Sequence, residues 1–148
     1  MNKAPYFTTL WVTGQFVGYH KWPDAPAEVG FLRHLHRHLF KVKLSIFVSH
    51  DNRQEEFFIV QDSLIHYLRE TFEHGFDVES TTSCEQMARR IAAHFLALDY
   101  KVRSVEVSED GENGATVHLL GASPYPQELV YHGADESVPA GSPSAVLD

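Results

Sequence analysis

One run of alternating side chains constrains the fold of this chain more strongly than any other feature. Apolar side chains occupy every second position from Phe40 to Val48. The opposite face of the same run carries Lys41, Lys43 and Ser45. Because successive side chains of a strand point to opposite faces, this alternation predicts a strand with one buried face.

The first part of the chain predicts a second strand. Residues 6–19 are rich in aromatic and β-branched residues, which favour strands, and Gly14 is a candidate β-bulge within them. Residues 21–30 contain two prolines and end in glycine, so they are predicted to form a loop.

Two helices are predicted in the middle of the chain. The first is expected around Asp62 to Phe72, where the spacing of apolar residues becomes helical. The second is expected to begin at Ser83 as N-cap, with Glu85 in the first turn, where the helix dipole favours an acid. Its apolar positions are Met87, Ala88, Ile91, Ala92, Phe95 and Leu96.

A final hairpin completes the predicted fold. A period of two returns after Asp99, residues 110–114 are predicted as a hairpin loop, and residues 115–120 as the return strand. The order β-β-α-α-β-β predicts an α+β fold, a four-stranded antiparallel sheet with two helices on one face. Such a sheet has two open edges, so we expect a homo-oligomer in which sheets join into a ring.

Composition divides the chain and excludes several classes of function. Residues 121–148 are rich in Gly, Pro and Ser and lack Lys and Arg, so we expect a folded domain at 1–120 and an acidic tail at 121–148. The net charge of −8, without a Lys/Arg-rich run, argues against nucleic acid or an anionic membrane as partner. The chain has no apolar run of membrane-spanning length and no signal-peptide pattern, so a soluble, cytoplasmic protein is expected.

The histidines are the candidate metal ligands. The single Cys excludes a Cys-x-x-Cys zinc site, so a transition metal would need some of the ten His. His36 and His38 lie two apart in a predicted strand, on one face and about 7 Å from each other, and they share the apolar face of Phe40. His20 could supply a third imidazole if the first two strands form a hairpin, giving a zinc site with one open position.

Other interpretations of these histidines are available. Such runs are often solvated surface residues, and a short His-x-His motif alone has a high false-positive rate. A cupin also uses His-x-His, but it needs a Glu about four residues later. Here Lys41, Val42 and Lys43 occupy that region, and no acid precedes Asp51.

Four short motifs, taken together and in order, resemble the 6-pyruvoyltetrahydropterin synthase and 6-carboxytetrahydropterin synthase family. The resemblance covers residues 7–120 and implies the tunnelling fold, whose subunits join into barrels, commonly as hexamers with active sites between subunits. The motifs are Phe16-x-x-x-His20, His36-x-His38-x-Phe40-Lys41-Val42, Ser83-Cys84-Glu85-Gln86-Met87-Ala88, and Val105-x-Val107-x-Glu109 closed by Gly114-Ala115.

The resemblance also implies residue roles and a reaction. It implies that His20, His36 and His38 bind zinc and that Glu109 grips the pyrimidine edge of a pterin. The alternation supports an inward Glu109, since it is in register with the apolar residues before it. The implied reaction is a carbon–oxygen or carbon–carbon lyase step on 7,8-dihydroneopterin triphosphate, in pterin or queuosine-type deazapurine biosynthesis.

The sequence departs from the family at the general base. The family has a cysteine four residues before the first His of the His-x-His pair, and this chain has Leu32 there. Cys84, at a predicted helix start, is expected to pack as a small hydrophobe. His34 could act as base if its strand extends far enough to place it beside His36, or it could be a loop residue.

The family's second proton carrier is an Asp-His pair after the first helix. Its nearest match is Glu73-His74, where the carboxylate could orient the imidazole. Alternatively, Glu73-His74-Gly75 is only a helix end with glycine as its cap. Two hypotheses follow: a zinc-dependent lyase with altered base chemistry, or a zinc- and pterin-binding relative whose catalysis is lost or changed.

Overall fold

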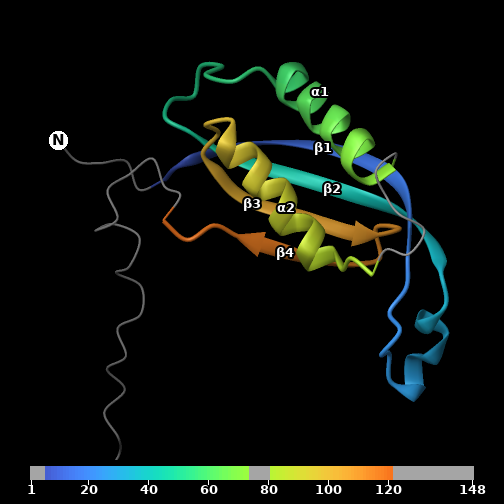
Figure 1. Cartoon of the computed structure of the whole chain (residues 1–148). Helices are drawn as coiled ribbons and strands as arrows, with labels where there is room; N and C mark the ends of the chain where they lie inside the picture. Colours follow the sequence, from blue (N-terminus) through green and yellow to red (C-terminus); the bar gives the residue numbers. More distant parts are fainter. Residues whose placement is uncertain (1–5, 74–80, 122–148) are drawn as a thin grey trace, which may run out of the picture.

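A computed structural model describes residues 6–73 and 81–121 and confirms an α+β fold built on one antiparallel sheet. The strands are β1 (Thr8–His20), β2 (His36–Val48), β3 (Val102–Glu109) and β4 (Asn113–His118), and they lie in the order β1-β2-β3-β4. Helices α1 (Phe57–Leu68) and α2 (Cys84–Ala97) cover one face of the sheet, as Figure 1 shows. α1 packs on β1, and α2 packs on β3 and β4.

The predicted alternation is confirmed on the strands. Even-numbered apolar residues of β1 and β2 point toward the helices and are buried, whereas their odd-numbered neighbours are mostly exposed or partly exposed. The largest fully buried side chains are Phe16, Phe40, Phe72, Phe95, Leu44, Ile46, Leu64, Leu68, Met87, Ile91, Val42 and Val60. The inner face of the sheet therefore forms the core along most of its length.

Gly14 does not form the β-bulge for which the sequence made it a candidate. It pairs with Val42 in an uninterrupted β1–β2 register, and the irregularity lies between Ser45 and Ile46, opposite β3. A β carbon on Gly14 would come 2.9 Å from Cδ1 of Leu68. The glycine therefore allows α1 to approach the sheet closely.

The first helix begins earlier than predicted. The carboxylate of Glu56 caps α1 by accepting hydrogen bonds from the backbone N–H groups of Phe58 (2.8 Å) and Ile59 (3.2 Å). Both capped residues are apolar yet exposed, so the apolar residues of the first turn do not follow the helical spacing from which the start was predicted around Asp62. The helix continues as a π-helical turn, η2 (Arg69–Glu73).

The second helix follows the prediction closely. The Ser83 hydroxyl accepts from the backbone N–H of Gln86, and the Gln86 side chain accepts from the backbone N–H of Ser83, which completes a capping box. Leu96 is the one member of the predicted apolar set that is not buried, with 42% of its surface exposed. It follows buried Phe95 directly, so its side chain points about 100° around the helix axis from that of Phe95.

The connection between β1 and β2 contains a short 3-10 helix, η1 (Ala27–Arg33), where only a loop was predicted. This connection extends beyond the end of the sheet, as Figure 1 shows.

The predicted return strand was placed slightly late, because β4 begins at Asn113. Among the described residues, no helix is long and apolar enough to cross a membrane.

Candidate metal centre

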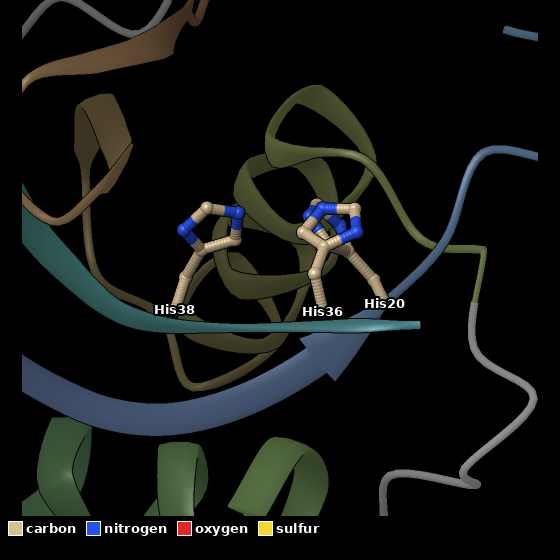
Figure 2. Close-up of side chains that lie close together, drawn as sticks. All are labelled: His20, His36 and His38. Carbon is tan, nitrogen blue, oxygen red and sulfur yellow. The ribbon is translucent and has the colours of Figure 1, made fainter. Parts of the chain in front are cut away.

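The β1–β2 hairpin brings the three predicted imidazoles together. His20 ends β1 and pairs directly with His36, the first residue of β2, while His38 stands two residues further along β2. Figure 2 shows the three side chains on the same side of the two strands. They occupy the end of the inner face, beyond Phe40, so the even-numbered alternation that builds the core also directs the histidines inward.

The geometry of the three rings is compatible with a metal site. One ligand atom from each histidine lies within 4.8 Å of the other two. All three Nε2 atoms are buried and make no hydrogen bond within the described residues. A buried polar nitrogen without a partner is costly, so three of them at one point indicate a site that could hold a metal ion.

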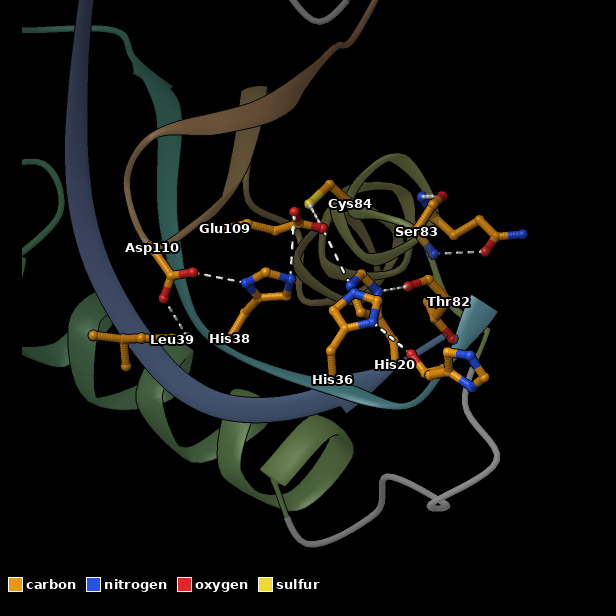
Figure 3. Close-up of polar contacts among 11 residues, drawn as sticks. His20, His36, His38, Leu39, Thr82, Ser83, Cys84, Glu109 and Asp110 are labelled. Atoms are coloured by element: carbon orange, nitrogen blue, oxygen red, sulfur yellow. Dashed lines mark hydrogen bonds and ion pairs between the residues drawn. The ribbon is translucent and has the colours of Figure 1, made fainter. Parts of the chain in front are cut away.

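The other nitrogen of each ring is held by an acceptor, as Figure 3 shows. Nδ1 of His20 lies 3.0 Å from the carbonyl oxygen of Thr82, and Nδ1 of His36 lies 2.7 Å from that of His34. Nδ1 of His38 lies 2.7 Å from Oδ2 of Asp110. Because these oxygens only accept, they favour the tautomer with the proton on Nδ1, which leaves the Nε2 lone pair available for a metal.

Burial favours the metal-binding form of His20. The side chain is largely enclosed, and this desolvation lowers the pKa of His20 below its ordinary value of 6.5, with smaller opposing effects from Thr82 and Glu109. The neutral imidazole is the form that coordinates zinc. Burial therefore favours the form of the His20 ring that a metal would need.

Glu109 faces the same point, as its register with Val105 and Val107 predicted. Its Oε1 lies 3.3 Å from Nε2 of His20, and its Oε2 lies 3.6 Å from Nε2 of His38. About 30% of the side chain is exposed. The carboxylate therefore lies beside the imidazoles and lines the same cavity as His20 and His36.

That cavity has a volume of about 500 Å³, which is in the range of small-molecule sites. It lies between the β1–β2 connection and the start of α2, and its wall includes His20, His36, Glu109, Trp22 and Leu32. The residue that departs from the family pattern, Leu32, is thus part of the cavity.

Cys84 also lines the cavity but is not an available base. Its Sγ lies 3.9 Å from Oε1 of Glu109. Burial, followed by the negative charges of Glu109 and Glu85, raises the pKa of Cys84 to about 12. The thiol is therefore protonated at neutral pH and packs as the small hydrophobe that the sequence predicted.

The other predicted proton carriers are not brought to the imidazoles. The His34 side chain is exposed and does not line the cavity, although its carbonyl orients His36. Glu73 is exposed at the end of η2, and His74 lies outside the described residues. Their catalytic roles stay predictions.

Sequence reasoning missed the acceptors that hold the rings, above all Asp110 and the carbonyl of Thr82. The Thr82 carbonyl carries no side-chain signal. Asp110 had one, since Asp-Gly marks a tight hairpin turn, but only the β2–β3 register shows that this turn lies beside His38.

The chain matches no family model, and no curated protein matches it significantly.

Proposed function

We propose that this chain is a zinc-dependent lyase that acts on 7,8-dihydroneopterin triphosphate. The observation that carries the proposal is the convergence of three buried imidazole Nε2 atoms, none with a hydrogen bond within the described residues, beside a carboxylate at one wall of a cavity. Each of the four motifs that resemble the 6-pyruvoyltetrahydropterin and 6-carboxytetrahydropterin synthase family contributes at least one residue to the lining of this cavity.

Zinc fits the donor set. Three imidazoles, with no fourth histidine beside them in the described part of the chain, correspond to a catalytic zinc site that keeps one position open. Zinc bound at His20, His36 and His38 would polarise the side-chain oxygens of the substrate and lower the barrier to proton removal from the adjacent carbon.

Glu109 would hold the substrate. A carboxylate can accept two parallel hydrogen bonds from the amino group and the ring N–H of a pterin. Because Glu109 borders both the imidazoles and the cavity, it would fix the substrate relative to the metal. The predicted proton carriers that remain are His34 and the Glu73–His74 pair, since Leu32 has no ionisable group and Cys84 stays protonated.

Leu32 and Cys84 favour a second candidate function. With Leu32 in the cavity wall and a protonated thiol at Cys84, the chain lacks the family's base at its usual place. A zinc- and pterin-binding protein with lost or changed catalysis would need only the three imidazoles and Glu109.

One experiment separates the two functions. We expect zinc-loaded protein to release triphosphate from 7,8-dihydroneopterin triphosphate, and chelator-treated protein to release none until zinc is restored. Pterin fluorescence measured in parallel reports binding, with Glu109→Gln as the variant that weakens it. Binding that depends on Glu109 without triphosphate release would favour the binding protein over the lyase.

We also propose that the chain forms a homo-oligomer, hexameric or trimer-based. In the order β1-β2-β3-β4, the outer strands β1 and β4 each leave one edge unpaired within the described chain. Trp11 on β1 is 56% exposed, and Phe58 at the start of the nearby α1 is 77% exposed. Sedimentation analysis at micromolar concentration should give a multiple of the 16.8 kDa chain, and a monomer mass would contradict this proposal.

A further inference from the structure

The three imidazoles differ in what orients them. His20 and His36 are held by backbone carbonyl oxygens, those of Thr82 and His34. His38 is held by a side chain, the carboxylate of Asp110, at 2.7 Å. The orientation of the His38 ring therefore depends directly on the side chain of Asp110, whereas the other two rings are oriented by the backbone.

The β3–β4 turn fixes the position of this carboxylate. Asp110 and Gly111 both have positive φ, 55° and 76°, and the N–H of Glu112 donates to the carbonyl of Glu109 at 3.0 Å. This tight turn folds Asp110 back onto β2, where its N–H donates to the carbonyl of Leu39 at 2.9 Å.

The two carboxylate oxygens of Asp110 have separate tasks. Oδ1 accepts from the backbone N–H of Leu39 at 2.9 Å, and Oδ2 accepts from Nδ1 of His38. The first contact anchors the carboxylate to the strand that carries His38, so the second is presented at a fixed angle, as Figure 3 shows. The result is a carboxylate–histidine pair that belongs to the cluster in which one ligand atom of each imidazole lies within 4.8 Å of the other two.

We propose that Asp110 is a positioning residue that holds His38 in the Nδ1-protonated form and thereby sets the affinity of the metal centre. The inference rests on the proposed metal site. A carboxylate behind a ligand imidazole fixes its tautomer and ring orientation and raises its basicity. Loss of such a partner typically weakens metal binding by about 10- to 100-fold.

Asp110→Asn is the sharpest test. The Asn carbonyl oxygen can keep the hydrogen bond from Leu39, but the amide nitrogen then faces Nδ1 of His38 as a donor. This arrangement favours the opposite tautomer, whose proton sits on Nε2 and blocks the metal. Glu112→Gln is the matched control, because it removes an equal charge from the same turn at an exposed position.

The readout is the zinc dissociation constant, measured by competition with a chromophoric chelator. We expect Asp110→Asn to raise it by about 10- to 100-fold and Glu112→Gln to leave it within about threefold of wild type. Equal affinities in the two variants would overturn the positioning role. If wild-type protein bound no zinc, the metal site itself would be refuted, and this inference with it.

A second measurement needs no variant. Imidazole nitrogen chemical shifts of metal-free wild-type protein, at a pH where His38 is neutral, should show the proton on Nδ1. A proton on Nε2 would overturn the proposal even if both variants failed to fold. A merely structural role for Asp110 would lower metal-free stability in Asp110→Asn without changing its zinc affinity once folded.

Discussion

Replacing His36 or His38 with alanine is expected to abolish zinc binding. Wild-type protein should carry about one zinc per chain, because three imidazoles and one open position make one mononuclear site. Each substitution leaves two ligands, too few to hold the ion through desalting. Metal analysis of freshly purified protein, repeated after zinc addition and desalting, measures the effect.

His66→Ala is the matched control for this experiment. His66 is exposed on α1, away from the three imidazoles, and alanine is favourable in a helix. It should retain the wild-type zinc content. Wild-type protein without zinc after both treatments would contradict the metal centre and the function built on it.

The second large effect is expected at Leu32. We expect Leu32→Cys to raise the rate of triphosphate release by about 100-fold, since a positioned general base contributes roughly 10²- to 10⁴-fold. Leu32 lines the cavity with His36 and Glu109, so a thiolate there would face the substrate as the family's cysteine is expected to do. Initial rates with 7,8-dihydroneopterin triphosphate measure the change.

Leu32→Ser separates the thiol from the smaller side chain. Serine creates the same space in the cavity wall but has no group that ionises near neutral pH. If the cysteine and serine variants release triphosphate equally slowly, position 32 does not carry the base in this chain. If wild-type protein already releases triphosphate fast and both variants have the same rate, another residue supplies the general base. His34 and the Glu73–His74 pair are then the candidates.

Substitutions at different residues of the proposed metal centre should have different effects. The imidazoles would supply the ligand atoms, but backbone carbonyls orient two of the rings and the β3–β4 turn orients the third through Asp110. Substitutions at the ligands should therefore abolish metal binding, whereas substitution at Asp110 should weaken it. Glu109 borders the same atoms and should affect pterin binding.

Much of the fold could be predicted because its signals are local. The alternation from Phe40 to Val48 and the Ser83 cap each depend on residues close in sequence, and both are confirmed. The start of α1 could not be found in this way. Its first turn is capped by the Glu56 carboxylate and exposes the apolar residues Phe58 and Ile59. The apolar residues in this turn therefore do not mark the buried face of the helix.

The sequence by itself determined that His36 and His38 share the inner face of a strand, because side-chain parity along a strand needs no knowledge of its neighbours. It also determined that Glu109 faces inward with the apolar residues of its strand. Only the tertiary structure decided that these groups meet, since the pairing of His20 with His36 and the approach of Asp110 to His38 depend on strand register. Register joins residues as far apart as His38 and Asp110, and that long-range pairing is what turns an alternating pattern into a candidate metal centre.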